Sequence, residues 1–330
     1  MNNNTILLID ESTINIQLYN SVSQAQIING ELISRNMKAV KNENELALFD
    51  KAMIKDGVAL TYAFSWLEET LKDREVSEVE FSNKLAACRS DQKDYYGESF
   101  AAIIGYKSNG AIIHYRPAEA TCAMIQNQGI LLADSGGQYY DGTTDITRTI
   151  CFSEPTEDQK NAYTRVLKGH IALATAIFPE GTTGGQLDIL ARQYLWQDGM
   201  NYLHGTGHGI GFFLNVHEPP QGFAPGSSQR ASSVHKVGMV TSNEPGFYKE
   251  GEFGIRIENL VVAKKSEKEG FLEFSTITLF PIDTKLIERS IMSSEELEWL
   301  NAYHSLVKEK LCPHLDEKHS EWISNKCQAI

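Results

Sequence analysis

Three short segments rich in glycine and acidic residues place the strongest constraint on this chain. In the first, Asp134 ends an apolar run and Asp145 follows eleven residues later. The second reads HGTGHGIG and contains His208, and the third holds Glu244 and, further on, Glu258. If the segments converge, the order Asp, Asp, His, Glu, Glu predicts a site with many oxygen donors and one nitrogen donor, which suits a pair of divalent metal ions.

Local patterns place three of the acidic residues on strands. Asp134 and Asp145 are expected on neighbouring antiparallel strands joined by glycine-containing turns. In the segment IRIE, alternation puts Arg256 and Glu258 on one face and the isoleucines on the core face. Four converging carboxylates could not all ionise without cations, and two divalent ions about 3.5–4 Å apart would neutralise them.

Each residue also has an ordinary structural interpretation when it is taken alone. Asp134 could be a turn residue, Asp145 a solvated edge-strand acid, His208 a core histidine in a tight loop, and Glu244 the cap of a turn. The donor set favours manganese over a thiolate-type zinc site, with cobalt, iron or zinc as alternatives.

Composition indicates an ordinary globular protein, with 42% apolar and 22% charged residues among 330. The net charge of −13 argues against non-specific binding to nucleic acid. No apolar run approaches the roughly 20 residues that span a bilayer, and the N-terminus lacks a signal-peptide pattern. Five cysteines without a C-x-x-C spacing indicate a reducing compartment, so we expect a cytoplasmic protein and no membrane partner.

Periodicity predicts an α+β fold in which pairs of helices alternate with antiparallel strands. Residues 5–18 resemble strand material, and residues 100–106 and 111–115 are expected to form a hairpin around the turn KSNG. Helices are expected over residues 42–71, 77–88, 156 to about 179, 185–197 and 294–311.

The chain resembles the pita-bread metallopeptidases, and within them the long, three-domain aminopeptidase P type. The resemblance rests on the run from Asp134 to Thr149, on YLHGTGHG at residues 202–209, and on LNVHE at residues 214–218. It implies a curved antiparallel sheet flanked by helices. It also implies a catalytic domain at residues 37–285, preceded by the remnant of another domain at 1–36 and followed by a helical extension at 286–330. The alternative for the first segment is a short natural protein with an extra hairpin.

The resemblance also implies roles for individual residues. Asp134 would bind one metal, Asp145 and Glu258 would bridge both, and His208 and Glu244 would complete the shell of the second.

Four further residues are implied near the substrate. His114 and His217 would act as catalytic donors, with Glu244 as the general base, and His204 would face the substrate. From its position on the face of Glu258, Arg256 is expected to orient a carboxylate, with Asp134 as the candidate.

The implied reaction is hydrolysis of the bond between an N-terminal residue and a following proline, in peptides with proline in second position. A homodimer is also implied, with the helix at 294–311 as either a dimer element or a helix packed on its own domain. Two alternatives stay open: a prolidase restricted to dipeptides, and an inert peptide-binding module. The proline ring could be walled by Phe212, Phe213, Tyr248 and Tyr115, which could equally be core residues.

Overall fold

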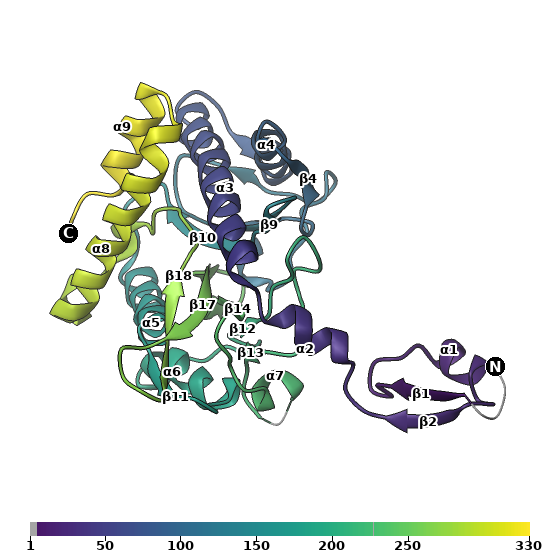
Figure 1. The fold of residues 1–330 in the computed structure, drawn as a ribbon. Helices are drawn as coiled ribbons and strands as arrows, with labels where there is room; N and C mark the ends of the chain where they lie inside the picture. The colour runs from purple at the N-terminus through teal and green to yellow at the C-terminus, as the bar shows by residue number, and fades with distance from the viewer. Residues whose placement is uncertain (1–4, 227) are drawn as a thin grey trace.

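The computed structural model describes residues 5–226 and 228–330. Its main body contains two groups of antiparallel strands, each covered by a pair of helices (Figure 1). The predicted α+β class is therefore confirmed. Within the described residues, no helix is both long enough and apolar enough to cross a membrane.

The first half of the body is built on the antiparallel sheet β10–β7–β5. The strands are β5 (Ile103–Tyr106), β7 (Ile130–Ser135) and β10 (Ile146–Cys151). They are covered by α3 (Glu43–Thr70) and α4 (Glu78–Ser90), whose apolar residues share one core with the strands. Both helices begin at side-chain caps, Asn42 and Ser77, and start where the sequence predicts.

The second half is built on the antiparallel sheet β11–β18–β17–β14, covered by α5 (Glu157–Ala174) and α6 (Gly184–Trp196). Its strands are β11 (Ile177–Pro179), β14 (Val240–Asn243), β17 (Asn259–Lys265) and β18 (Phe271–Thr276). The helix α5 ends before the expected position near residue 179, because residues 177–179 pair with β18 and form the edge strand.

Short strands complete the body and carry several of the segments singled out above. They are β3 (Val76–Ser77), β4 (Tyr95–Glu98), β6 (Met124–Ile125), β8 (Gly137–Tyr139), β9 (Gly142–Thr143), β12 (Gly207–His208), β13 (Gly222–Phe223), β15 (Gly246–Lys249) and β16 (Phe253–Arg256), together with the short helix α7 (Gln229–Ser232).

The hairpin expected around residues 107–110 is wrong. Lys107–Ala111 form a 3₁₀ turn and residues 112–115 are not a strand. The buried carboxylate of Glu78 explains the difference, because it accepts hydrogen bonds from the backbone N–H of Tyr106, the amide of Asn109 and the hydroxyl of Tyr115. These bonds draw the segment onto α4 and away from a strand partner.

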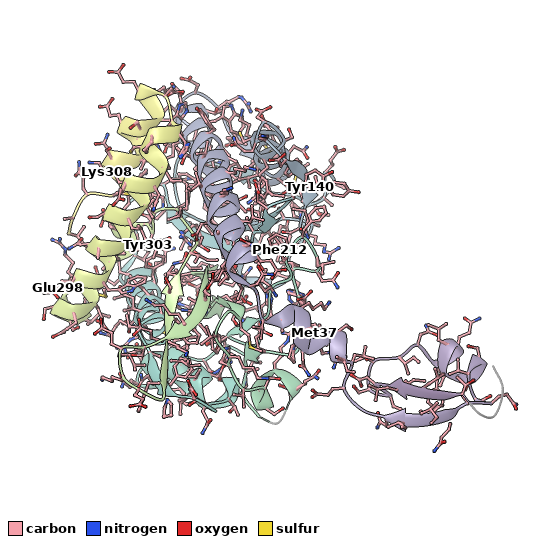
Figure 2. All side chains as sticks on the ribbon, viewed as in Figure 1. Met37, Tyr140, Phe212, Glu298, Tyr303 and Lys308 are labelled. Atoms are coloured by element: carbon pink, nitrogen blue, oxygen red, sulfur yellow. The ribbon has the colours of Figure 1, made fainter. Side chains whose placement is uncertain are left out.

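The N-terminal residues form a β-α-β unit that projects from the body (Figure 1). It consists of β1 (Ile6–Ile9), α1 (Ile16–Ser21) and β2 (Gln26–Asn29), and its strands pair in parallel, so neither a hairpin nor a continuous strand over residues 5–18 is present. The helix α2 (Ile33–Ala39) joins this unit to the body and contains the expected domain boundary after residue 36. Met37 on this helix is exposed (Figure 2).

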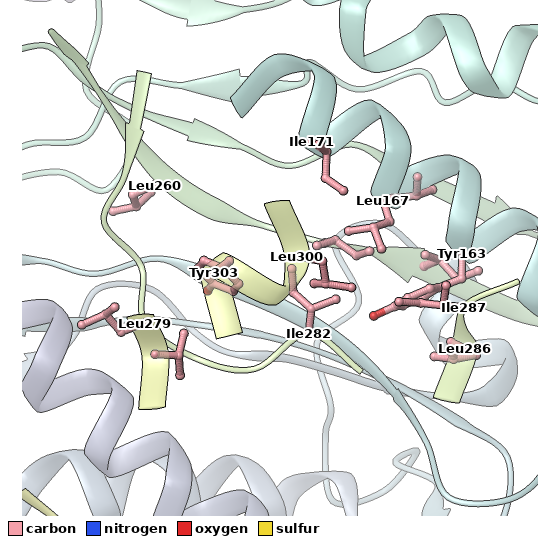
Figure 3. Packing of buried hydrophobic residues seen from close by; sticks show 14 of the residues in the cluster. Tyr163, Leu167, Ile171, Leu260, Leu279, Ile282, Leu286, Ile287, Leu300 and Tyr303 are labelled. Atoms are coloured by element: carbon pink, nitrogen blue, oxygen red, sulfur yellow. The ribbon is translucent and has the colours of Figure 1, made fainter. Parts of the chain in front are cut away.

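The C-terminal helices α8 (Ser294–Leu311) and α9 (Glu317–Lys326) pack beside α3 and α5, so the predicted helix over 294–311 is confirmed. Leu300, Val307 and Leu311 of α8 are buried in the same core as Tyr163 and Leu167 of α5, and part of this packing is shown in Figure 3. The apolar face of α8 is thus used within its own chain.

Candidate functional site

A cavity of about 430 Å³ lies between the two halves of the body and is lined by residues from both. All nine site residues predicted from the sequence line this cavity: His114, Asp134, Asp145, His204, His208, His217, Glu244, Arg256 and Glu258. The sequence places them up to 144 positions apart, so their convergence is a property of the fold.

The first pair of carboxylates comes from adjacent antiparallel strands. Asp134 lies in β7 opposite Thr147 of β10, and Asp145 immediately precedes β10. The chain between them makes a close approach at Gly136, where a Cβ atom would overlap with the carbonyl oxygen of Thr144. Glycine is therefore required at this position for the two acidic residues to face the same cavity.

His208 and Glu244 come together through a second close approach. A Cβ atom at Gly207 would overlap with the carbonyl oxygen of Ser242, which lies in β14. The backbone N–H of His208 donates to the hydroxyl oxygen of Ser242 at 2.9 Å, and this hydroxyl donates to Oε1 of Glu244 at 3.1 Å. The serine thus fixes the histidine and the glutamate relative to each other.

The ring of His208 directs a lone pair at two carboxylates. Its Nδ1–H donates to the carbonyl of Gly209 at 3.1 Å, which leaves Nε2 unprotonated in the neutral ring. Nε2 lies 3.4 Å from Oδ2 of Asp145 and 3.4 Å from Oε1 of Glu244. Burial and the nearby His217 lower the pKa of His208 well below its ordinary value, so the ring is neutral at pH 7. Acceptors therefore face acceptors, an arrangement that requires a cation or a shared proton.

The carboxylates, too, are buried close together without enough positive charge to neutralise them. Burial, followed by the charges of the other acidic residues, raises the pKa values of Asp145 and Glu258 well above their ordinary range. Burial raises the pKa of Glu244 to about 7, although Arg256 opposes this shift. Donor atoms of Asp145, His208 and Glu258 all lie within 4.8 Å of one another, so this group can hold a metal ion. Together with Asp134 and Glu244, the donor set fits two divalent cations.

Arg256 orients two of these carboxylates. Its Nη2 donates to Oδ2 of Asp134 at 2.7 Å, which is the contact predicted from the sequence. Its Nε donates to the hydroxyl of Thr147 at 3.1 Å, and this hydroxyl donates to Oε2 of Glu258 at 2.7 Å. Oδ1 of Asp134 is buried and has no hydrogen-bond partner among the described residues, as expected of an oxygen that binds a cation.

The three remaining histidines line the cavity in different states. Both ring nitrogens of His204 are engaged, Nδ1 with the carbonyl of Gly205 at 2.7 Å and Nε2 with the hydroxyl of Tyr248 at 2.9 Å. His217 is exposed and packs edge-on against His208, with ring centroids 4.1 Å apart. His114 is also exposed to the cavity. His114 and His217 are therefore accessible to a ligand, whereas His204 is held by protein groups.

The aromatic residues proposed as walls of a proline pocket do not line the cavity. Phe212 packs against Phe49, Phe213 against other surface rings, and Tyr115 is bound to Glu78. Tyr248 lies beside the cavity, where its hydroxyl links His204 to Arg256. The apolar lining comes from four other residues: Phe100, Ala101, Ile103 and Ile113.

Arg230 is a lining residue that the sequence analysis missed. It lies on the four-residue helix α7, and among the described residues no hydrogen bond or ion pair engages its guanidinium. Burial is the main cause of the lowered pKa values of His208 and His217, and the charge of Arg230, which lines the same cavity, lowers them further. The segment around it has no periodicity or motif, so only the folded arrangement reveals it.

Comparisons with known proteins agree with this geometry. The model of metallopeptidase family M24 matches residues 47–265, and that of the C-terminal region of peptidase M24 matches residues 270–330. A curated relative named probable Xaa-Pro aminopeptidase P, from Arthroderma gypseum, is 48% identical over 303 residues, which cover 89% of this chain. The chain spans about half the length of that relative, 48%.

Two solved structures show the same fold. An X-prolyl aminopeptidase from Caenorhabditis elegans, described as a cytosolic enzyme with a di-nuclear active site, superposes with a TM-score of 0.87 at 35% identity; the match covers 93% of this chain and 51% of that one. A Xaa-Pro dipeptidase from Bacillus anthracis superposes with a TM-score of 0.71 at 27% identity, covering 84% and 74%. The pita-bread fold expected from the resemblance is confirmed, and the chain belongs to metallopeptidase family M24.

Proposed function

We propose that this chain is a metal-dependent Xaa-Pro aminopeptidase that removes an N-terminal residue from peptides with proline in second position. The observation that carries the proposal is the convergence of Asp134, Asp145, His208, Glu244 and Glu258, a complete set of donors, on one cavity. The names of the relatives from Arthroderma gypseum and Caenorhabditis elegans support the same activity.

The five donors would hold two divalent ions. When bound, the ions supply Lewis acidity that activates a water molecule and a carbonyl group. Glu244 lines the cavity beside the other donors, which suits its Oε1 to accept a proton from the attacking water. His114 and His217 are exposed to the cavity and would donate to the oxygen that becomes negative when water attacks the carbonyl before proline.

The apolar part of the cavity would receive the proline ring. Phe100, Ile103 and Ile113 provide apolar surface within the same cavity as His114 and His217. This assignment replaces the four aromatic residues expected from the sequence, and it places the proline beside the proposed oxyanion donors.

Manganese is the metal we propose, because carboxylate oxygens outnumber the single histidine nitrogen. We also propose a homodimer. Since the apolar face of α8 is packed within its own chain, a dimer would have to use other surfaces. A cytoplasmic location and the division at residues 36 and 285 stay predictions.

A dipeptidase is the second candidate, and Arg230 favours it. A cation that lines the cavity without a protein partner could bind the free carboxylate of an Xaa-Pro dipeptide. A dipeptidase would use the charge of Arg230 to bind its substrate, whereas an aminopeptidase would also act on longer peptides that have no carboxylate at this point. The dipeptidase would be selected if the protein hydrolyses Xaa-Pro dipeptides but not Xaa-Pro-Yaa peptides, and if Arg230→Gln loses the hydrolysis of the dipeptides.

The test of the proposed function combines metal analysis with turnover. The manganese-loaded protein is expected to release alanine from Ala-Pro-Ala and to leave Ala-Ala-Ala intact. Loss of turnover after dialysis against a chelator, with recovery on adding Mn²⁺, supports the metal site. Full activity in a metal-free sample, or equal cleavage of both peptides, contradicts the proposal.

A further inference from the structure

A second cavity adjoins the one that contains the metal donors. Its volume is about 400 Å³, and it is lined by Ser99, Gln138, Leu214, Asn215, Val216 and His217. His217 lines both cavities, and Ser99 of the second directly precedes Phe100 of the first. The two cavities therefore meet between His217 and the Ser99–Phe100 segment.

The floor of the second cavity is held in place by hydrogen bonds around one carbonyl. Nε2 of Gln138 donates to the carbonyl oxygen of Leu214 at 2.6 Å, and the hydroxyl of Thr143, which lies 3.2 Å from the same oxygen, is closer to the acceptor Oε1 of Gln138, at 2.8 Å. The Asn215 side chain is exposed, and among the described residues it makes no hydrogen bond. None of the six lining residues carries a carboxylate, an ammonium or a guanidinium group. The cavity therefore offers amide and apolar contacts.

Three aromatic rings cluster on residues that neighbour the lining of this cavity along the chain or across a strand pair, and we term them the aromatic ledge: Tyr96, Tyr140 and Phe213. Their ring centroids are 6.1 Å apart for Tyr96 and Tyr140, 5.4 Å for Tyr96 and Phe213, and 5.0 Å for Tyr140 and Phe213. Phe213 directly precedes Leu214, and Tyr140 follows Gln138 by two positions, which ties the ledge to the wall of the cavity.

The ledge remains accessible although it is apolar. Tyr96 is 70% exposed and Tyr140 is 57% exposed, and Tyr140 lies at the outer edge of the body (Figure 2). Phe213 has a φ of 51°, a left-handed conformation that costs a non-glycine residue about 1–3 kcal/mol. Strained residues of this kind concentrate at binding sites, and exposed clusters of large rings mark contact surfaces.

We propose that the second cavity and the aromatic ledge bind the part of a substrate peptide that follows the proline, with preference for an apolar or aromatic side chain there. The inference rests on the proposed function. His217 packs directly on the donor His208, so a peptide whose scissile bond lies at the donors and whose proline lies near Phe100 continues past His217 into the second cavity. Each further residue of an extended peptide advances by about 3.3–3.6 Å.

This surface separates long peptides from dipeptides. A dipeptide ends at the proline and would place its carboxylate in the first cavity, whose lining includes Arg116 and Arg230. A longer peptide carries an uncharged amide at that point, and the neutral lining of the second cavity suits it. The residue after proline would contact Asn215 and Leu214, and the following side chain would reach the ledge.

The test compares Ala-Pro-Ala-Phe-Ala with Ala-Pro-Ala-Ser-Ala and with Ala-Pro-Ala. The wild-type protein is expected to cleave the phenylalanine peptide with a kcat/KM about fivefold to tenfold above that of the serine peptide. The difference should lie mostly in KM, because the phenylalanine ring would contact two aromatic rings of the ledge. The double substitution Tyr96→Ala with Tyr140→Ala should remove this preference and leave cleavage of Ala-Pro-Ala within about twofold.

Ile177→Ala provides the matched control, because Ile177 is an exposed apolar residue (46%) on β11 that lines neither cavity. It should keep the phenylalanine preference. Equal rates on both pentapeptides, or a double variant that keeps the preference, would overturn the inference while cleavage of Ala-Pro-Ala upholds the proposed function. A double variant that keeps the preference but elutes at a smaller size would show instead that a second copy covers the ledge. No cleavage of any Xaa-Pro peptide by the metal-loaded protein would refute both.

Discussion

A buried ion pair between Lys41 and Glu218 connects the start of the body to the loop that carries His217. Nζ of Lys41 lies 3.3 Å from Oε1 of Glu218, and the two side chains are 0% and 1% exposed. Lys38 approaches the other oxygen at 3.0 Å but is 39% exposed. The backbone N–H of Glu218 donates to the carbonyl of Gly209 at 2.8 Å, so the glutamate is anchored at both its backbone and its side chain.

Replacing Lys41 with methionine keeps most of the side-chain volume and removes the charge. Glu218 would then be a buried carboxylate whose remaining cationic neighbour is half-exposed. Removing one partner of a buried pair costs about 3–5 kcal/mol, and the presence of Lys38 places the expectation near the lower value, about 3 kcal/mol. For a domain of this size the melting temperature should fall by about 4 °C or more.

The assay is thermal melting followed by circular dichroism, with Lys41→Met, Glu218→Gln and the double variant measured in one buffer with Mn²⁺. The double variant should recover most of the loss, because no unpaired charge is left buried. Lys38→Met is the matched control for loss of a charge at the surface and should change the melting temperature by about 2 °C or less. A Lys41→Met protein that melts within 1 °C of wild type, or a double variant as unstable as the sum of the singles, refutes the reasoning.

Three further predictions concern the donors. Glu244→Gln should lower kcat by at least about 10²-fold while the fold is kept, and a loss below about tenfold would contradict the assignment of the base. Without metal the same substitution should stabilise the protein at pH 8 by about 3 kcal/mol. The reason is that burial raises the pKa of Glu244 from 4.5 to about 7 in the folded protein, so its ionisation above pH 4.5 destabilises the fold. The stability difference between the variant and the wild type, measured by denaturation curves, should therefore vanish below pH 4.5. A difference that is the same at every pH would exclude this cause. Finally, His208→Ala should reduce the bound metal measured by elemental analysis, whereas His114→Ala and His217→Ala should keep it and lower kcat by about 10²–10³; equal loss of metal in all three would reverse their roles.

Much of the site follows from local sequence, because Asp134, Asp145 and Glu258 lie at or beside strands whose patterns are visible. The alternation after Asp145 predicts β10, and the pattern IRIE puts Arg256 on the face of Glu258, where it reaches Asp134. The glycine at 136 marks a turn in the sequence, and the structure adds the reason, a close backbone approach. Helix caps such as Asn42 likewise fix α3 at its start.

Other features depend on partners far away in the sequence and could not be predicted. Residues 111–115 look like a strand, but the carboxylate of Glu78, on α4, holds the segment in a turn. Phe213 and Tyr115 are plausible pocket walls by residue type, yet side-chain contacts with Tyr140 and Glu78 direct them elsewhere. An aromatic ring carries no local signal that distinguishes a pocket from a core or a surface cluster.

Arg148 shows how a distant part of the chain supports the donors. This arginine is buried, and among the described residues no carboxylate contacts it. It donates to the carbonyl oxygen of Glu258 at 2.6 Å, to that of Phe280 at 2.7 Å and to the hydroxyl of Tyr303 on α8 at 2.9 Å. A guanidinium held at the backbone of a donor partly offsets the repulsion among the carboxylates. Helix α8 therefore contributes, through Tyr303 and Arg148, to the electrostatics of the site as well as to the core.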